Sequence, residues 1–326
     1  MTPVELSRTV LHAVRRAVDE GELSVTVPER VVVTPPGPGG CGDYATNIAL
    51  QLARPAGQPP LRVAEILRPH LVSVAGVEDV VVTGPGFLNI SLRPDADPTA
   101  HLVRDVRERG AAYGHSDVLA GQVVTLRVPY DVRAEVIADA VVRIVATQGG
   151  RVEVEHGEPV NLRPVPAPED PAPLGPDAAQ WALLHPAPHD RPRITADHLV
   201  QREGNPLFRV RYAYARTRAL TRNAVRLGFS AAPGDPDHTD AVVLVTALAD
   251  HPRILAAAAT HRAPDRLARH LVTVADAALP FLLTVLPRGE EKPSAAHRAR
   301  LALAEAAGTV LAGGLSLLGI DAPDHL

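Results

Sequence analysis

Cysteine and lysine are almost absent from this chain of 326 residues. Cys41 is the single cysteine and Lys292 the single lysine. One thiol can form neither a disulfide within the chain nor a multi-thiol metal site, so a cytoplasmic location is the default expectation. Because the single lysine lies near the end of the sequence, chemistry that needs a lysine in an earlier loop is excluded.

Long apolar runs and a strong net charge are also missing. The longest apolar stretch, 271–286, is interrupted by Asp276 and Pro280 and is shorter than the roughly 20 residues that cross a bilayer. The first residues contain neither a basic segment nor an apolar segment typical of a secretory signal. The net charge of −4 argues against a protein that coats nucleic acid by bulk attraction. These features predict a globular protein with no membrane partner, in which any nucleic-acid site is local.

Residues 1–95 are expected to form an α+β domain. Thr2, Pro3 and Glu5 make a capping box with proline at the first position of a helix that ends near Asp19. The other expected elements are a strand pair or one kinked strand at 23–33, a helix capped by Asp43 and ending near Ala53, a helix at 62–72, and strands at 79–82 and 86–92.

The middle of the chain, 96–156, contains one βαβ unit. A helix capped by Asp97 runs to Arg109, and a strand at 122–128, a helix at 132–147 and a strand at 151–155 follow. Residues 157–176 include seven prolines, which predict a stiff linker without packed secondary structure.

The last segment, 177–326, is expected to be an all-α bundle. Gly319 is the expected cap of its final helix. Helical patterns cover residues 177–184, 195–202, 206–227, 239–249, 252–259, 265–286 and 294–318.

No cofactor, metal or catalytic site is predicted. Gly37, Gly39 and Gly42 match the spacing of a dinucleotide-binding loop, but the prolines within 35–38 lack amide donors and Asp43 would repel a phosphate. His185 and His189 are separated by two prolines, so they share no helical face as a zinc pair would, and are expected to be solvated. Cys41 has no basic neighbour in the sequence that would activate it.

One stretch is strongly basic. Residues 201–230 contain seven arginines against the single acid Glu203, with Phe208, Tyr212 and Tyr214 among them. Arginines beside aromatic residues suit phosphate contact combined with base stacking. A solvated helix face whose aromatic side chains belong to the core is an equally good interpretation. The arginines are Arg202, Arg209, Arg211, Arg216, Arg218, Arg222 and Arg226.

Several motifs resemble those of arginyl-tRNA synthetases. Residues 42–53 read Gly-Asp-Tyr-Ala-Thr-Asn-Ile-Ala-Leu-Gln-Leu-Ala and residues 84–90 read Gly-Pro-Gly-Phe-Leu-Asn-Ile, which resembles the N-terminal additional domain of that family. Residues 205–216 read Asn-Pro-Leu-Phe-Arg-Val-Arg-Tyr-Ala-Tyr-Ala-Arg and resemble the helix that opens its DALR-type anticodon-binding domain. Residues 266–271 and 318–323 continue the likeness, which covers about 1–155 and 177–326.

The resemblance also points to what is missing. After the strand at 122–128 the family carries a His-x-Gly-His signature, whereas residues 129–135 read Pro-Tyr-Asp-Val-Arg-Ala-Glu. The Lys-Met-Ser-Lys-type loop would precede Pro176, where there is no lysine. The resemblance therefore implies a Rossmann-like core reduced to one βαβ remnant and a catalytically inactive paralogue that binds tRNA, with arginine tRNA as the expected species.

The resemblance assigns contact residues as well. Phe87 and Asn89 match positions that contact the tRNA D-loop. The anticodon side is expected to involve Arg209, Arg211, Tyr212, Arg216 and Leu326. The chain ends Asp-His-Leu where the family often ends in Arg-Met, so recognition of the anticodon is expected to be weakened or changed.

Two other interpretations stay open. The folds could serve a protein-interaction or regulatory module that does not bind tRNA, with a full-length synthetase as a candidate partner. Residual arginine-tRNA ligase activity is a third interpretation, against which the missing signatures argue.

Overall fold

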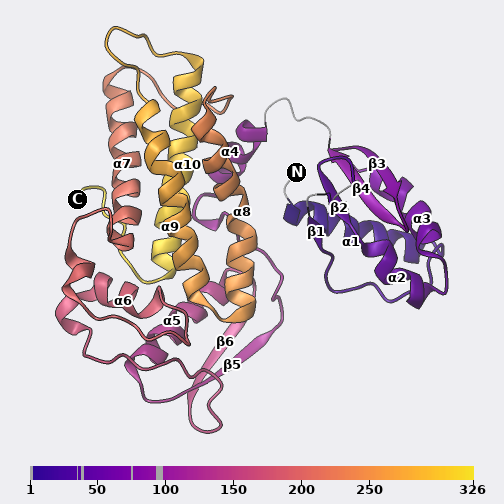
Figure 1. Ribbon diagram of the computed structural model, residues 1–326, viewed down its shortest axis with the longest axis horizontal. Helices are drawn as coiled ribbons and strands as arrows, with labels where there is room; N and C mark the ends of the chain where they lie inside the picture. The colour runs from indigo at the N-terminus through magenta and orange to yellow at the C-terminus, as the bar shows by residue number, and fades with distance from the viewer. Residues whose placement is uncertain (1–2, 35, 38–39, 75, 93–97) are drawn as a thin grey trace. The chain divides into compact units, whose positions relative to one another are not determined.

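The computed structural model describes residues 3–34, 36–37, 40–74, 76–92 and 98–326. The chain divides into two compact units, 1–98 and 99–326. Both helix and strand are present, and the long helices gather in the second unit (Figure 1). The α+β class expected from the sequence is therefore confirmed.

In its described residues, the first unit is a four-stranded antiparallel sheet with three helices. The strand order is β1-β2-β4-β3. Val80, Leu88 and Ile90 lie on the face of the sheet that packs in a buried core with Leu6 of α1 and Leu67 of α3. The elements are α1 (Pro3–Asp19), β1 (Val33–Thr34), β2 (Tyr44–Thr46), α2 (Ile48–Ala56), α3 (Pro60–Val72), β3 (Val77–Thr83) and β4 (Phe87–Leu92).

Two expectations for this unit were wrong. Within 23–33, only Val33 belongs to a strand, because the two residues of β1 alone pair with β2. Asp43 does not cap a helix: the next residues form β2 against β4, and the Asp43 carboxylate accepts the backbone N–H of Leu92 at 2.8 Å. Helix α2 starts later, after Asn47.

Several of the expected features fall outside the described residues. These are Thr2 of the capping box, the Asp97 cap, and Pro35, Pro38 and Gly39 of the glycine-rich loop.

The second unit combines the βαβ unit with a helical bundle. Strands β5 and β6 are parallel neighbours, and α5 connects them. Helices α7 to α10 lie alongside one another in Figure 1. The elements are α4 (Pro98–Arg109), β5 (Val123–Val128), α5 (Val132–Ala146), β6 (Arg151–His156), α6 (Pro176–Leu184), α7 (Pro206–Arg226), α8 (Thr239–His261), α9 (Pro264–Phe281) and α10 (Ala295–Leu317).

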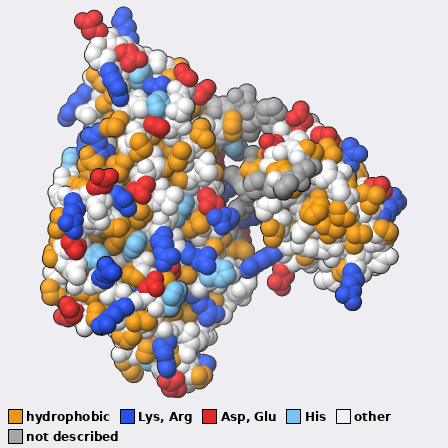
Figure 2. Space-filling view, in the orientation of Figure 1, with side chains coloured by type: hydrophobic (Ala, Val, Ile, Leu, Met, Phe, Trp, Pro, Cys, Tyr) orange, Lys and Arg blue, Asp and Glu red, His pale blue; other side chains and the backbone are white. Residues whose placement is uncertain are grey.

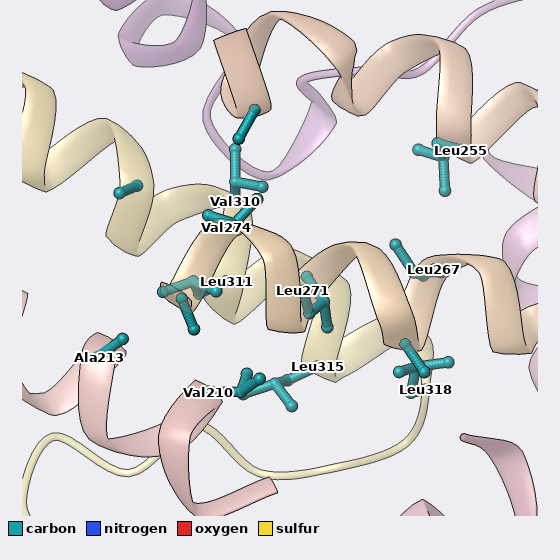
Figure 3. Close-up of a cluster of buried hydrophobic side chains, with 14 of the residues drawn as sticks. Val210, Ala213, Leu255, Leu267, Leu271, Val274, Val310, Leu311, Leu315 and Leu318 are labelled. Atoms are coloured by element: carbon teal, nitrogen blue, oxygen red, sulfur yellow. The ribbon is translucent and has the colours of Figure 1, made fainter. Parts of the chain in front are cut away.

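One hydrophobic core joins the βαβ unit to the bundle. Leu126 of β5 and Ile137 of α5 belong to the same buried cluster as Leu271 of α9 and Leu315 of α10. Figure 3 shows the bundle part of this cluster, where Leu271 lies between α9 and α10. The reduced βαβ unit is therefore an integral layer of the helical unit.

The predicted helices in this unit need three corrections. Residues 195–202 form only a short 3-10 turn, Ala196–Leu199, and α9 gives way to a 3-10 turn after Phe281. The two helices expected around Pro252 are one continuous helix, α8. A proline leaves the carbonyl four residues earlier without its helical donor, and here the Tyr113 hydroxyl donates to that carbonyl, of Leu248, at 3.1 Å. Pro252 is tolerated because this bond replaces the missing one.

The cap of the last helix is as expected. Gly319 has a φ of 74°, in the left-handed region that glycine adopts without strain. The Ile320 N–H then bonds the Leu315 carbonyl at 2.9 Å, as in a Schellman motif.

The proline-rich segment lies against the second unit. Leu162 and Leu174 are buried in its core. The Asn161 side chain accepts the Arg127 N–H at 2.8 Å and donates to the Thr125 carbonyl at 2.9 Å. These bonds cover part of the edge of β5 that does not face β6.

Two helices in the described part of the chain have the length and composition of membrane spans. They are α8 and the stretch Pro264–Thr284. Core helices of soluble proteins pass the same test, and here both pack into the bundle, with 33% and 56% of their most apolar windows buried. This is weak evidence for a membrane, and the absence of a membrane partner stays a prediction.

Candidate nucleic-acid interface

The start of α7 is fixed by its cap. Asn205 accepts the N–H groups of Leu207 and Phe208, and its amide donates to the carbonyls of His198 and Val200 at 2.8 and 3.0 Å. Proline at the first helical position has no N–H that needs a partner. The helix that carries most of the predicted site residues therefore begins at a well-anchored point.

An aromatic pair lies on the first turns of α7. The rings of Phe208 and Tyr212 stack with centroids 5.4 Å apart and an angle of 18° between their planes. Arg216 follows one turn later in the same i, i+4 row. Phe208 and Tyr212 line a hollow of about 500 Å³ between α7 and α9, together with Arg209.

Most arginines of residues 201–230 are already paired with carboxylates. Arg202 contacts Asp197 at 2.6 Å, Arg209 contacts Asp276 at 3.4 Å, Arg211 contacts Asp177 at 3.2 Å and Arg218 contacts Asp324 at 3.2 Å. Within the described part of the chain, Arg216 and Arg226 have no ion pair or side-chain hydrogen bond. The face seen in Figure 2 agrees, since blue and red side chains lie interspersed over the second unit.

The chain end lies next to α7. Leu326 is half exposed and lines a second pocket, of about 240 Å³, with Phe208, Arg211 and Asp177. Four of the five predicted anticodon-side residues are therefore distributed over two neighbouring hollows: Arg209 and Tyr212 line one, and Arg211 and Leu326 line the other, whereas Arg216 lines neither.

The two predicted residues of the first unit differ in accessibility. Phe87 and Asn89 point to the same face of β4. Phe87 is 40% exposed, whereas Asn89 is only 2% exposed. The Asn89 amide donates to the Thr83 hydroxyl at 2.6 Å and lies within 3.4 Å of the Val81 carbonyl. Phe87 is presented to solvent, and Asn89 is held within the sheet.

The position of the missing signature after β5 is occupied by a buried arginine. Arg133 is fully buried near the start of α5, and burial lowers the pKa of its guanidinium. Its N–H groups point at backbone carbonyls of residues that belong to the proline-rich segment or follow it in the sequence. These are the carbonyls of Val165, Leu183, Pro186, Ala187, Pro188 and Asp190, at 2.7 to 3.5 Å.

The histidines differ from one another. His185 stacks on Trp181 with centroids 5.0 Å apart, and burial lowers its pKa to about 4, so the expectation of a solvated side chain was wrong. Among the residues that the structure describes, one group could hold a cation: His70 is buried with its Nε2 2.6 Å from Glu22 and 3.9 Å from Glu20. The Glu22 carboxylate already gives the His70 ring a hydrogen-bond partner.

The contact between the C-terminal tail and α7 was not predicted from the sequence. Tyr214, Arg218, Arg222 and Asp324 come together where the C-terminal tail meets α7. Tyr214 and the two arginines were visible in the basic stretch, but their partner lies about a hundred residues further along the chain.

Known families match both units. The model described as the arginyl tRNA synthetase N terminal domain matches residues 5–92, and the DALR anticodon binding domain matches 210–326. Curated arginine-tRNA ligases of Paenarthrobacter aurescens and Renibacterium salmoninarum are 38% and 40% identical over 169 residues. Each alignment covers 48% of this chain but only 30% of the relative, so the chain matches less than a third of their length.

Solved structures show the same fold. The arginyl-tRNA synthetase of Thermus thermophilus gives a TM-score of 0.61 at 15% identity and covers 100% of both chains. That of Plasmodium falciparum gives 0.56 at 8% identity and covers 99% of both chains.

The fold and the matched domains define a protein assembled from aminoacyl-tRNA synthetase modules. More specifically, the chain is an arginyl-tRNA synthetase-related protein with a truncated core. Its DALR anticodon-binding domain relates it to tRNA binding.

Proposed function

We propose that this protein binds tRNA, with arginine tRNA as the preferred species, and does not charge it with an amino acid. The observation that carries the proposal is that two domains of arginyl-tRNA synthetases flank a core of one βαβ unit. By resemblance, the first unit would contact the D-loop through Phe87 and Asn89. The second would approach the anticodon through Arg209, Arg211, Tyr212, Arg216 and Leu326.

Three features argue against catalysis. Adenylate formation requires donors aimed at the developing charge of the phosphates, and losing one such donor typically costs about 3–4 kcal/mol of transition-state stabilisation. Residues 129–135 contain no histidine, and no lysine precedes Lys292. The guanidinium of Arg133 is directed at backbone carbonyls, so it is not available to a triphosphate.

The face of α7 formed by Phe208, Tyr212 and Arg216 supports RNA binding. Stacking a base on an aromatic side chain contributes about 1–3 kcal/mol. Arg216 has no ion pair among the described residues, so its full positive charge would be available to attract a phosphate. Arg209 and Arg211 would first have to exchange their carboxylate partners.

The test is a binding titration with arginine tRNA and one unrelated tRNA at several salt concentrations. We expect selective binding that weakens with salt, by a log-log slope of about 0.7 to 0.9 per phosphate contact. Arg216→Ala should reduce that slope by about one contact. Arg226→Ala is the matched control, because Arg226 is an exposed arginine, unpaired among the described residues, at the last position of α7, away from the aromatic pair. Equal effects of the two substitutions would contradict the assignment of Arg216.

A protein-interaction module is the second candidate function. It is favoured by the ion pairs that neutralise four arginines of residues 201–230 and by the net charge of −4. Failure to bind either tRNA, together with a complex with a full-length arginyl-tRNA synthetase in sedimentation, would favour it. Charging of arginine tRNA by the purified protein would instead refute the proposal of an inactive paralogue.

A further inference from the structure

The C-terminal tail holds a carboxylate against α7. The Asp324 Oδ1 accepts the Tyr214 hydroxyl at 3.0 Å and the Arg218 Nε at 3.2 Å. The Arg222 guanidinium lies 3.4 Å from the Asp324 carbonyl oxygen and 3.4 Å from Nδ1 of His325. One hydroxyl and two guanidinium groups therefore converge on a single residue of the tail, which runs beside α7 in Figure 1.

These donors form a row along the helix. Positions 214, 218 and 222 are four residues apart, so their side chains project from one strip of α7. The strip lies on a different side of the helix from the one that carries Tyr212 and Arg216, because positions two residues apart are separated by about 160° around the helix axis. A phosphate bound at this row would therefore be a contact separate from the one at Tyr212 and Arg216.

The donor set is the kind that binds phosphate. Arginine and tyrosine side chains are common donors to phosphate oxygens, and charge-assisted bonds are the strongest of these. Hydrogen bonds from Tyr214 and Arg218 lower the pKa of Asp324, so the carboxylate is charged at neutral pH. Its charged oxygen stands where a phosphate oxygen could be bound.

The contact can be exchanged. The side chains of Arg218 and Asp324 are 47% and 45% exposed. Exposed ion pairs contribute little to stability, so the tail could release the arginines without unfolding the unit.

We propose that Tyr214, Arg218 and Arg222 form a binding site for a backbone phosphate of RNA, which the Asp324 carboxylate occupies when no RNA is bound. The inference rests on the proposed tRNA binding. It implies that the tail competes with RNA and that the free protein binds tRNA more weakly than α7 alone would allow.

The experiment compares Asp324→Asn with Asp321→Asn. Asp321 is an exposed acid of the same tail whose carboxylate makes no hydrogen bond or ion pair among the described residues, so its substitution removes the same charge without freeing α7. We expect Asp324→Asn to tighten tRNA binding several-fold more than Asp321→Asn and to steepen the log-log salt slope by about one. Adding Arg218→Ala to the Asp324→Asn variant should remove the gain. Thermal melts of all variants should agree closely, since the contact is exposed.

The outcomes separate this inference from the proposed function. If the wild-type protein binds tRNA and Asp324→Asn binds no better than Asp321→Asn, or binds more weakly, then Asp324 only positions the tail and the inference is wrong. If neither the wild type nor Asp324→Asn binds tRNA, the proposed function and the inference both fail. Binding by Asp324→Asn alone would support both and show that the tail dominates in the free protein.

Discussion

The buried guanidinium of Arg133 provides the sharpest test of how the second unit holds together. Arg133→Met keeps an unbranched side chain of comparable length but removes every donor. The side chain lies in the core at the start of α5, where water cannot replace those donors. The carbonyls that it serves would lose this donor, and of the six only those of Ala187 and Pro188 keep a backbone N–H partner within the described chain, from Asp190 and Val165.

The size of the effect follows from the bonds. The contacts to the carbonyls of Val165, Ala187 and Asp190 are 2.7, 2.9 and 2.7 Å long. Hydrogen bonds to a charged group contribute about 1.5–3 kcal/mol each. The three shortest contacts alone therefore predict a loss of at least about 4 kcal/mol in the free energy of unfolding. This is a large part of the stability of a typical domain.

Urea unfolding followed by tryptophan fluorescence measures this loss directly. Trp181 is the single tryptophan, is fully buried, and lies on α6 two residues before one of the acceptor carbonyls, that of Leu183. The matched control is Arg143→Met on the same helix, where one bond, from Nε to the Leu317 carbonyl at 2.9 Å, is lost. A loss in Arg133→Met no larger than in Arg143→Met would refute the reasoning.

Two further predictions concern the bundle. Gly314→Ala should destabilise the second unit by about 1–3 kcal/mol in the same assay, because the new Cβ would lie 2.4 Å from the Leu271 side chain. The control is Gly313→Ala, where the nearest atom to the new Cβ would be 4.0 Å away. This second substitution should stabilise α10 by about 0.5–1 kcal/mol. Burial lowers the pKa of His251 to about 3 and that of His270 to about 4. As the pH falls below about 6.5, these histidines therefore take up protons in the unfolded chain but not in the folded one. The free energy of unfolding should fall between about pH 6.5 and 4, by about 1.4 kcal/mol per pH unit per histidine. His270→Gln should flatten this dependence, and an unchanged slope would show that the histidine is not buried in its neutral form.

Much of the fold could be predicted because local signals agreed with tertiary packing. The helix ending at Asp19 and the βαβ unit both have strong periodicity, and both exist as expected. Prediction failed where a partner decided the conformation. Residues 44–46 form a strand because β4 lies beside them, and α8 continues through Pro252 because Tyr113 replaces the lost hydrogen bond. Neither partner is close in the sequence.

The candidate site shows the same limit more sharply. The sequence located the arginines of α7 and showed seven arginines against one acid in residues 201–230, but this positive charge is largely neutralised in the structure. Three of the four acids responsible, Asp177, Asp276 and Asp324, lie in α6, α9 and the C-terminal tail. Charge counted along a window of sequence cannot register such pairs, because the fold alone brings them together. Arg216 thereby becomes the most informative arginine for binding experiments.

The reduced core raises the question of how two parallel strands persist alone. Parallel sheets are normally covered on both faces, and free strand edges tend to pair with other chains. Here α5 packs into the bundle core, and Asn161 bonds to the outer edge of β5. The outer strand β6 carries Arg151, Glu153 and Glu155 at alternate positions, and charged side chains disfavour edge-to-edge association. The proline-rich segment thus covers an edge where a larger sheet would continue, and through Arg133 it is tied to the start of α5. Open sheets of this kind bind nucleotides at the carboxyl ends of their strands. Around the end of β5, the backbone and side chains are instead engaged in the contacts that stabilise the small core.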